Sequence, residues 1–205
     1  MEAGSRRELH LVCAAVNKVV CLNVGTKYKD HDYTGKLYRG LQRNLTAPFD
    51  FECITESPYP TWWGKLTIFG RNERLVFSDL DNIIVGNCDF LFEYEGNFCI
   101  LHDFYRYKGF GSAVMAIAPN FGARIREDFE ANAKEVMRNF LGDQNFIESK
   151  VDSADEWQSL YPGKIVSYKA HECEKGLPDG AAIVCFHGIP KPHEVDHDWL
   201  KEHWR

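Results

Sequence analysis

The sequence predicts an α/β fold in which a mainly parallel sheet is flanked by helices. Short apolar runs alternate with turn-rich or helical stretches along the chain, and this alternation is typical of parallel sheets. The chain has 205 residues, of which 44% are hydrophobic. That is enough for one domain with a sizeable core and too little for two ordinary domains. We therefore expect a single domain over residues 16–205, preceded by a loose N-terminal extension over residues 1–15.

The predicted strands are apolar runs bounded by turn residues, and they cover residues 19–22, 51–55, 75–78, 98–101, 113–117 and 182–186. The run at 75–78 leads into Asp79-Leu80-Asp81 and then the apolar residues 83–85. Residues 106–112 form a glycine-rich polar loop ahead of the run at 113–117. A first helix is expected where leucines recur every four residues from Leu37, with Thr34 as its N-cap. A second runs from Ile125 to Phe140 and is closed by Gly142, and a short helix then begins at Asp143.

Composition narrows the class of protein. The N-terminus lacks the pattern of a secretory leader, and no apolar run reaches the roughly 18 residues of a membrane helix, so we expect a cytoplasmic protein without a membrane partner. The seven cysteines include no C-x-x-C pair and most lie in apolar runs, which favours buried free thiols. A net charge of −6 argues against non-specific coating of nucleic acid. The sequence does not predict an oligomeric state.

The strongest chemical pattern is Asp79-Leu80-Asp81, which follows the apolar run at 75–78. Two carboxylates spaced two apart at the end of a strand point to the same side, and in an open α/β sheet that side faces the ligand-binding crevice. Hard cations such as Mg²⁺ and Mn²⁺ prefer oxygen ligands and share phosphate oxygens. The alternative is that both aspartates cap a turn, since such a short motif often arises by chance.

Two further segments carry reactive side chains. In the first, His187-Gly188 is followed by Lys191, so an imidazole metal ligand and a phosphate-binding ammonium lie on one proline-stiffened loop. In the second, Asp143-Gln144 follows Gly142 and would face a ligand at a helix N-terminus. Each has an ordinary structural alternative: a histidine bonded in a turn, a solvated lysine, and an aspartate N-cap.

Taken in this order, the motifs resemble those of nucleotide-sugar glycosyltransferases of the GT-A fold. The likeness is to the glycogenin-like and lipopolysaccharide galactosyltransferase-like group and to small phage and bacterial relatives. That group has a D-x-D after an apolar strand, a later Asp-Gln pair and a closing H-x-x-G-x-x-K-P element. This chain matches the last from Gly188 to Pro192, but Cys185 stands where the family has histidine. Positions 185 and 187 share a face of a strand, so His187 is expected to take over the ligand role.

The resemblance spans about residues 19–205 and implies a Rossmann-like GT-A domain that moves a sugar from a nucleotide-sugar, expected to be a UDP-sugar. It implies Mn²⁺ or Mg²⁺ held by Asp79, Asp81 and His187, and Asp143 and Gln144 as the catalytic pair. Asp143 would be either the base of an inverting reaction or a positioning group, and the likeness favours retention. The donor-binding residues that the resemblance implies are Gly25, Lys27, Tyr28, Lys65, Leu80, Gly111, Ser112, Gly188 and Lys191.

The acceptor stays open between a saccharide, another small hydroxyl compound and a hydroxymethylated pyrimidine in DNA. Basic residues that would meet DNA phosphates are Lys27, Lys29, Lys36, Arg39 and Arg43. A solvated basic helix face explains the same residues, and we favour it because charge runs usually are solvated. Tryptophans Trp62 and Trp63 are either core residues or an acceptor platform.

Two functions of other classes remain. One is a haloacid-dehalogenase-type phosphatase, although its D-x-D usually lies on the first strand and is followed two residues on by Thr or Val, where this chain has Ile83. The other is a domain that binds a nucleotide-sugar without turning it over.

Overall fold

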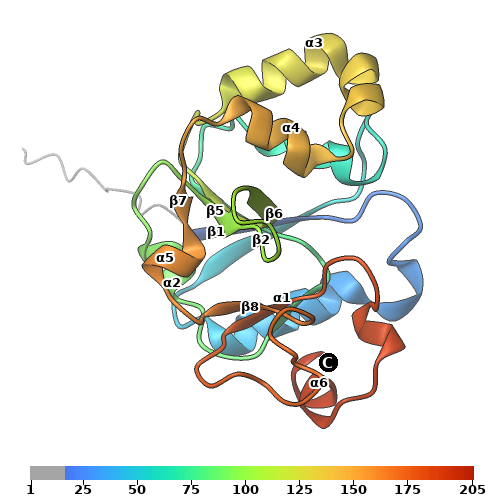
Figure 1. The fold of residues 1–205 in the computed structure, drawn as a ribbon, viewed down its shortest axis with the longest axis vertical. Helices are drawn as coiled ribbons and strands as arrows, with labels where there is room; N and C mark the ends of the chain where they lie inside the picture. Colours follow the sequence, from blue (N-terminus) through green and yellow to red (C-terminus); the bar gives the residue numbers. More distant parts are fainter. Residues whose placement is uncertain (1–16) are drawn as a thin grey trace, which may run out of the picture.

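A six-stranded sheet forms the middle of the molecule (Figure 1). The computed structural model describes residues 17–205, and the expected N-terminal extension lies outside them. The strand order is β2-β1-β3-β6-β5-β7. Strand β6 runs antiparallel to β3 and β5, and the other pairings are parallel, which confirms a mainly parallel sheet. The strands are β1 (Asn17–Leu22), β2 (Phe49–Ile54), β3 (Leu75–Ser78), β5 (Phe98–His102), β6 (Phe110–Ile117) and β7 (Asp155–Glu156).

A second, smaller sheet has the order β4-β9-β8. Its strands are β4 (Asn82–Ile84), β9 (Ile183–Cys185) and β8 (Ile165–Ser167). The run at 182–186 contains a strand, as predicted, and the apolar run after Asp81 contributes β4; the two strands pair antiparallel with each other outside the central sheet. Residues 110–112, predicted as loop, are the first residues of β6.

Helices cover both faces of the central sheet. Helices α3 and α4 lie on one side, and α1, α6 and the smaller sheet lie on the other (Figure 1). The longer helices are α1 (Tyr33–Asn44), α3 (Ala123–Asn139) and α4 (Asp143–Lys150), and the shorter ones are α2 (Phe90–Glu93), α5 (Trp157–Leu160) and α6 (Asp198–His203). The 3-10 helices are η1 (Lys29–His31), η2 (Thr61–Ile68) and η3 (Pro192–Glu194).

The predicted caps of two helices are wrong. Asp32 caps α1, because its side chain accepts a hydrogen bond from the Gly35 amide, while the Thr34 hydroxyl accepts one from Asn23 Nδ2 at 3.0 Å. Helix α3 ends at Asn139, and Gly142 is the residue that precedes α4. Helix ends depend on side chains that are close in space as well as on local pattern, so such errors are expected.

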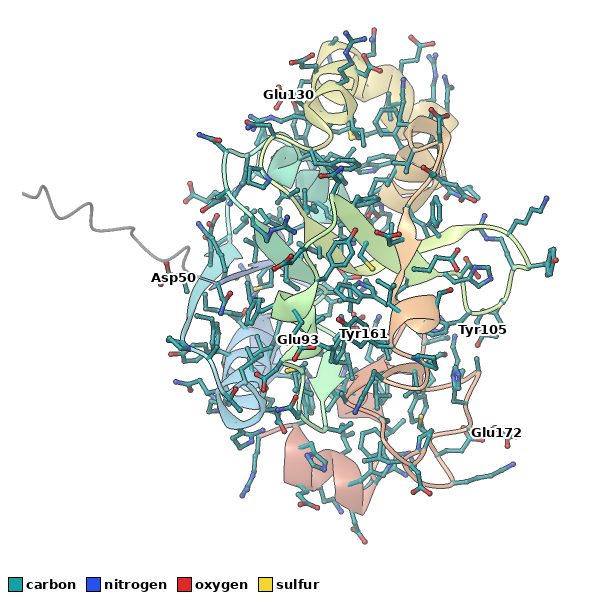
Figure 2. The ribbon with its side chains drawn as sticks, turned by 90° about the vertical axis from the view of Figure 1, so that its left-hand side faces the viewer. Asp50, Glu93, Tyr105, Glu130, Tyr161 and Glu172 are labelled. Atoms are coloured by element: carbon teal, nitrogen blue, oxygen red, sulfur yellow. The ribbon has the colours of Figure 1, made fainter. Side chains whose placement is uncertain are left out.

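The strands of the central sheet bury side chains on both faces. Val19 and Cys21 of β1 pack on the side of α1, whereas Val20 between them packs on the side of η2 and α3. Strand β3 shows the same alternation, with Val76 on one face and Phe77 on the other. Burial on both faces explains why these strands are continuous apolar runs. Side chains fill the space between the layers (Figure 2).

Candidate active site

Strand direction gathers the candidate residues at one edge of the central sheet. Strands β1 and β3 are parallel neighbours, so the segments that follow Leu22 and Ser78 leave the sheet on the same edge. Because β6 runs the other way, its first residues lie at that edge too, and the Asp79 amide donates to the Ala113 carbonyl at 2.8 Å. This antiparallel pairing explains why Ser112 and Asp79, which are 33 positions apart in the sequence, both contact the Lys65 ammonium.

The Asp79-Leu80-Asp81 segment passes from one sheet to the other. Asp79 is hydrogen-bonded to β6 of the central sheet, whereas the Asp81 carbonyl accepts from the Phe186 amide at 3.1 Å, beside the β4–β9 pairing. Leu80 between them is 2% exposed and packs into the core. The backbones of both aspartates are therefore fixed, that of Asp79 by the central sheet and that of Asp81 beside the smaller sheet.

Lys65 lies at the centre of one charged cluster. Its ammonium is 3.0 Å from Asp79 Oδ1 and 3.1 Å from Asp143 Oδ2, and it also donates to the Ser112 hydroxyl at 3.1 Å. The Ser112 hydroxyl in turn donates to Asp143 Oδ2 at 2.8 Å. Burial alone would lower the pKa of Lys65, but the Asp143 and Asp79 carboxylates hold it above its usual value. Lys65 is therefore charged in the folded protein.

The charged form of Asp79, unlike that of Lys65, is disfavoured by its surroundings. Enclosure in the site, with further repulsion from Asp81 and Asp143, raises the pKa of Asp79 to about 6 against the attraction of Lys65. The side chain keeps 34% of its surface exposed, and that surface faces the cavity described below. A carboxylate whose negative charge is only partly compensated is suited to accept a further cation.

Lys191 forms an ion pair with Asp81, the second carboxylate of the D-x-D segment. Its ammonium forms a short ion pair with Asp81 and donates to the Phe186 carbonyl at 3.2 Å. Strand β9 ends at Cys185 opposite Asn82, the residue that follows Asp81, so the loop that carries Lys191 starts beside the D-x-D segment. The Tyr28 hydroxyl also donates to Asp81, at 3.2 Å, and burial followed by the Asp81 charge raises the pKa of Tyr28.

His187 lies on the same loop. Its Nε2 is 2.6 Å from the Ser167 hydroxyl, and its ring stacks on Phe104 with centroids 5.6 Å apart. Burial, and then the charge of Lys169, lowers the pKa of His187, so the ring is neutral at pH 7, as a metal ligand must be.

A cavity of about 250 Å³ collects most of the predicted site. Gly111 lines a neighbouring cavity instead, and Gly25 lines neither of the two. The predicted residues in the first cavity are Lys27, Tyr28, Lys65, Asp79, Leu80, Asp81, Ser112, Asp143, Gln144, His187, Gly188 and Lys191. Sequence reasoning missed Asn82, whose position directly after the D-x-D is a usable clue.

The two tryptophans, Trp62 and Trp63, differ in their exposure to solvent. Trp63 is 6% exposed and stacks on Phe129 in the core, whereas Trp62 is 45% exposed and lines the cavity. Thr61 beside it, also in the cavity wall, has a φ of 50°, which is unusual for a β-branched residue.

Three of the basic side chains considered for DNA are engaged within the protein. Arg39 donates to the Arg205 carbonyl and pairs with Asp32, and Arg43 donates to the His203 carbonyl at 2.6 Å. The Lys36 ammonium lies 3.6 Å from the centre of a Trp204 ring. This face of α1 therefore binds the last residues of the described chain.

The chemistry of the donor set fits a hard divalent cation. Within residues 17–205 no three His, Cys, Asp or Glu side chains are arranged to hold a metal between them. Asp79 and Asp81 nevertheless offer two carboxylates to one cavity, and Mg²⁺ or Mn²⁺ characteristically takes one or two carboxylates and completes its shell with water and phosphate. The two aspartates would hold the ion, and His187, the third ligand predicted from the sequence, is not grouped with them in this arrangement.

Solved structures with the same architecture are glycosyltransferases. The glycosyltransferase GlyE of Streptococcus pneumoniae TIGR4 aligns with a TM-score of 0.64 at 16% identity, over 92% of this chain and 63% of that one. The bifunctional glycosyltransferase WbbM aligns with a TM-score of 0.63 at 13% identity, over 95% and 50%. A glycosyltransferase involved in the glycosylation of the major capsid of PBCV-1 aligns with a TM-score of 0.56 at 12% identity, over 90% and 97%.

The chain has the GT-A glycosyltransferase fold. It spans less than two thirds of the GlyE structure and half of WbbM. No protein-family model and no curated protein matches the sequence. The GT-A fold confirms the expected fold class.

Two other expectations can be compared with the described residues. The cysteines at 21, 53, 88, 99, 173 and 185 are all free thiols, as predicted. Within the described part of the chain, no helix is long and apolar enough to cross a membrane.

Proposed function

We propose that the protein is a metal-dependent glycosyltransferase that moves a sugar from a nucleotide-sugar, of which a UDP-sugar is the first candidate, to a hydroxyl acceptor. The observation that carries the proposal is the grouping of three carboxylates and two buried ammonium groups around one cavity at the edge of a GT-A sheet. The carboxylates are Asp79, Asp81 and Asp143, and the ammonium groups are those of Lys65 and Lys191.

The cavity has different chemistry at its two ends. Lys27 and Tyr28 follow β1 and line the end expected to take the nucleoside, and Lys191 with the D-x-D carboxylates lies where a diphosphate would bind. A bound divalent ion would neutralise charge on that diphosphate. Lys65, Ser112 and Asp143 are joined by hydrogen bonds at the other end and would hold the hydroxyl groups of the donor sugar.

In the proposed reaction the bond between the anomeric carbon and the β-phosphate oxygen breaks, and its electron pair leaves with the nucleoside diphosphate. The acceptor oxygen forms the new bond to that carbon. Lys191 would stabilise the charge that develops on the leaving oxygen, if it turns from Asp81 to the phosphate.

The acceptor proton would pass to the departing phosphate oxygen. Asp143 is a poor candidate for this proton, because its Oδ2 already accepts from Ser112 and is paired with Lys65. A positioning role for Asp143 agrees with a retaining reaction.

The test is release of nucleoside diphosphate from UDP-glucose and UDP-galactose with Mn²⁺, for the wild type and for Asp81→Ala. We expect the variant to lose at least about 100-fold in rate, because it loses both a metal ligand and a partner of Lys191. Asp81→Asn keeps the shape of the side chain and should be nearly as slow. The matched control is Asp50→Ala, since Asp50 is an exposed residue of β2 at the surface of the molecule (Figure 2).

Thermal unfolding with each nucleotide-sugar, with and without Mn²⁺, separates binding from turnover, because a ligand of the native state raises the melting temperature. Equal rates for wild type and Asp81→Asn would remove the metal from the proposal. Stabilisation without turnover would favour a domain that only binds the nucleotide-sugar.

A further inference from the structure

A second cavity, of about 210 Å³, lies against the first. The two share Asp79, Ser112, Ala113, Gln144, Cys185 and His187; of these, Ser112 was assigned above to the donor sugar and Asp79 to the metal and diphosphate. A molecule in the second cavity would therefore lie next to the sugar that is to be transferred. The remaining wall comes from Gly111 of β6, and from the end of β5 and the loop that follows it, with Leu101, Asp103, Phe104 and Tyr105.

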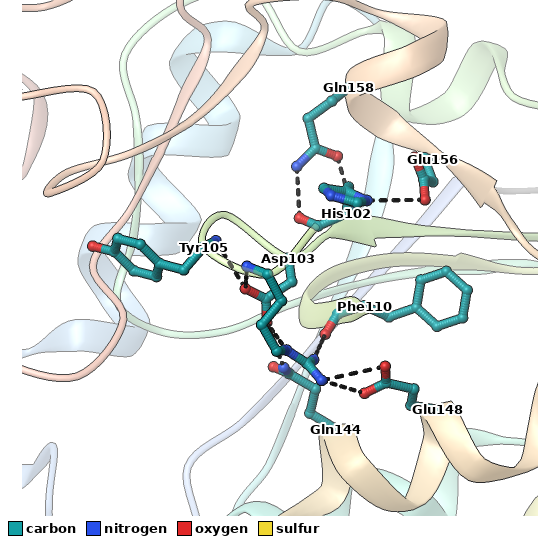
Figure 3. A network of polar contacts seen from close by, with 9 residues as sticks. His102, Asp103, Tyr105, Phe110, Gln144, Glu148, Glu156 and Gln158 are labelled. Carbon is teal, nitrogen blue, oxygen red and sulfur yellow. Dashed lines mark hydrogen bonds and ion pairs between the residues drawn. The ribbon is translucent and has the colours of Figure 1, made fainter. Parts of the chain in front are cut away.

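The loop between β5 and β6 is fastened to α4. Asp103 Oδ1 accepts from the amides of Tyr105 and Arg106, both at 2.9 Å, so the carboxylate closes the turn (Figure 3). Arg106 donates through Nε to Asp103 at 2.9 Å and through a terminal nitrogen to Glu148 of α4 at 3.0 Å. Gln144, at the start of the same helix, donates to Asp103 at 3.2 Å. The loop is thus built as a fixed wall, tied to the helix that carries Asp143.

Aromatic side chains form much of this wall. Phe104 lies flat against His187, and the Tyr105 ring meets His187 edge-on with centroids 5.4 Å apart. Tyr105 is 62% exposed although it lines the cavity, and it points away from the Arg106 network (Figure 3). An exposed aromatic ring held beside polar groups is suited to stack against a ligand while those groups fix its orientation.

The polar groups indicate which ligand fits. The Gln144 amide donates to Asp103 through one N–H, so its other N–H and its oxygen can bond a hydroxyl group of a sugar ring. A nucleic acid would need cations for its phosphates. Arg106 is committed to Asp103 and Glu148, and the arginines of α1 donate to C-terminal carbonyls. The charge of Lys169 beside His187 is opposed by those of Asp81 and Asp103.

We propose that this second cavity is the acceptor site, and that it takes the terminal pyranose of an uncharged saccharide with Tyr105 as its aromatic wall. The inference rests on the proposed function, because the neighbouring cavity must hold the donor. It names the class of acceptor that the function leaves open.

The experiment compares wild type with Tyr105→Ala, and uses methyl pyranosides of glucose, galactose, mannose and xylose as probes. The probe that most accelerates nucleoside diphosphate release from UDP-glucose or UDP-galactose is then titrated. We expect Tyr105→Ala to raise the KM for that pyranoside roughly tenfold more than the KM for the donor. Tyr105→Phe should restore most of the loss, because the ring is retained.

The matched control is Tyr107→Ala. Tyr107 lies on the same loop and is 91% exposed, but it lines neither cavity, so this variant should behave as wild type. Equal effects at Tyr105 and Tyr107 would overturn the inference. So would stronger acceleration by an oligonucleotide containing 5-hydroxymethylcytosine than by any pyranoside.

Saturation-transfer NMR from the aromatic protons to the same pyranosides gives a readout that does not need turnover. Contact that Tyr105→Ala abolishes, in a protein that turns over no donor, would refute the proposed function and support the site. Donor turnover with no contact to any of the pyranosides, and no acceleration by them, would support the proposed function and refute the acceptor site.

Discussion

Replacing Lys65 by methionine removes the charge that separates the buried Asp143 carboxylate from the half-buried Asp79 carboxylate. The Lys65 side chain is 3% exposed, and its ammonium lies within 3.1 Å of both Asp79 and Asp143. Methionine keeps the length and apolar stem of the side chain but leaves the carboxylates facing each other. Removal of one partner from a buried ion pair typically costs about 3–5 kcal/mol of unfolding free energy. At roughly 2–4 °C per kcal/mol for a chain of this size, the melting temperature should fall by about 6–20 °C.

The pH dependence of this loss follows from the carboxylates. The pKa of Asp79 is about 6 with Lys65 present, and losing the ammonium raises it further. A carboxyl group whose pKa is raised in the folded state lowers stability as the pH rises through that pKa, because the folded protein must then give up a proton that it binds more tightly. The difference between Lys65→Met and wild type should therefore be larger at pH 7 than at pH 5, where one carboxylate can be protonated.

The assay is urea or thermal unfolding of both proteins at the two pH values. Lys150→Met is the matched control, because Lys150 pairs with Asp128 at 2.7 Å at the surface, where such a pair is worth about 0–1 kcal/mol. A loss at Lys65 as small as that at Lys150 would refute the reasoning, and so would a larger loss at pH 5 than at pH 7.

Two further predictions follow from pKa values. Because protons compete with a metal for Asp79, whose pKa is about 6, the Mn²⁺ concentration that gives half-maximal donor turnover should rise as the pH falls from 7 to 5; a constant value would exclude Asp79 as a ligand. The hydrogen bond from Cys21, opposite it on β1, lowers the pKa of Cys53 to about 6, whereas burial raises that of Cys88 to about 12. In native protein at pH 7, iodoacetamide followed by mass spectrometry should therefore find Cys53 alkylated well before Cys88, and equal rates would contradict this.

Local patterns were sufficient to predict the part of the site that local sequence builds. Asp79 and Asp81 stand out because two charges follow a buried strand, and Lys191 because prolines and a glycine surround it. What could not be predicted is which groups meet. Lys65 touches Asp143 because η2 and α4 cover the same face of the sheet, a contact between residues 78 positions apart.

The fold was predictable to the same extent. Apolar runs identified most strands, since a strand buried on both faces needs no polar alternation. Their pairing could not be predicted, because nothing in residues 110–117 indicates that β6 runs antiparallel to its neighbours. Gly111 and Ser112 were expected in a loop because residues 106–112 are polar and rich in glycine, whereas residues 110–112 begin β6. Asp103 and Tyr105 were missed because their importance arises from long-range contacts with Gln144 and His187.

The passage of Asp79-Leu80-Asp81 between the sheets has a mechanical consequence. Asp79 is hydrogen-bonded to the central sheet and Asp81 to a residue beside the smaller one, while Leu80 is buried in the core between them. Any shear of one sheet against the other must change the spacing of the two carboxylates. A ligand bound to both carboxylates would therefore hold the two sheets in one relative position, and movement of one sheet against the other would weaken the binding of that ligand. The affinity for that ligand and the rigidity of the contact between the two sheets would then both depend on Asp79-Leu80-Asp81.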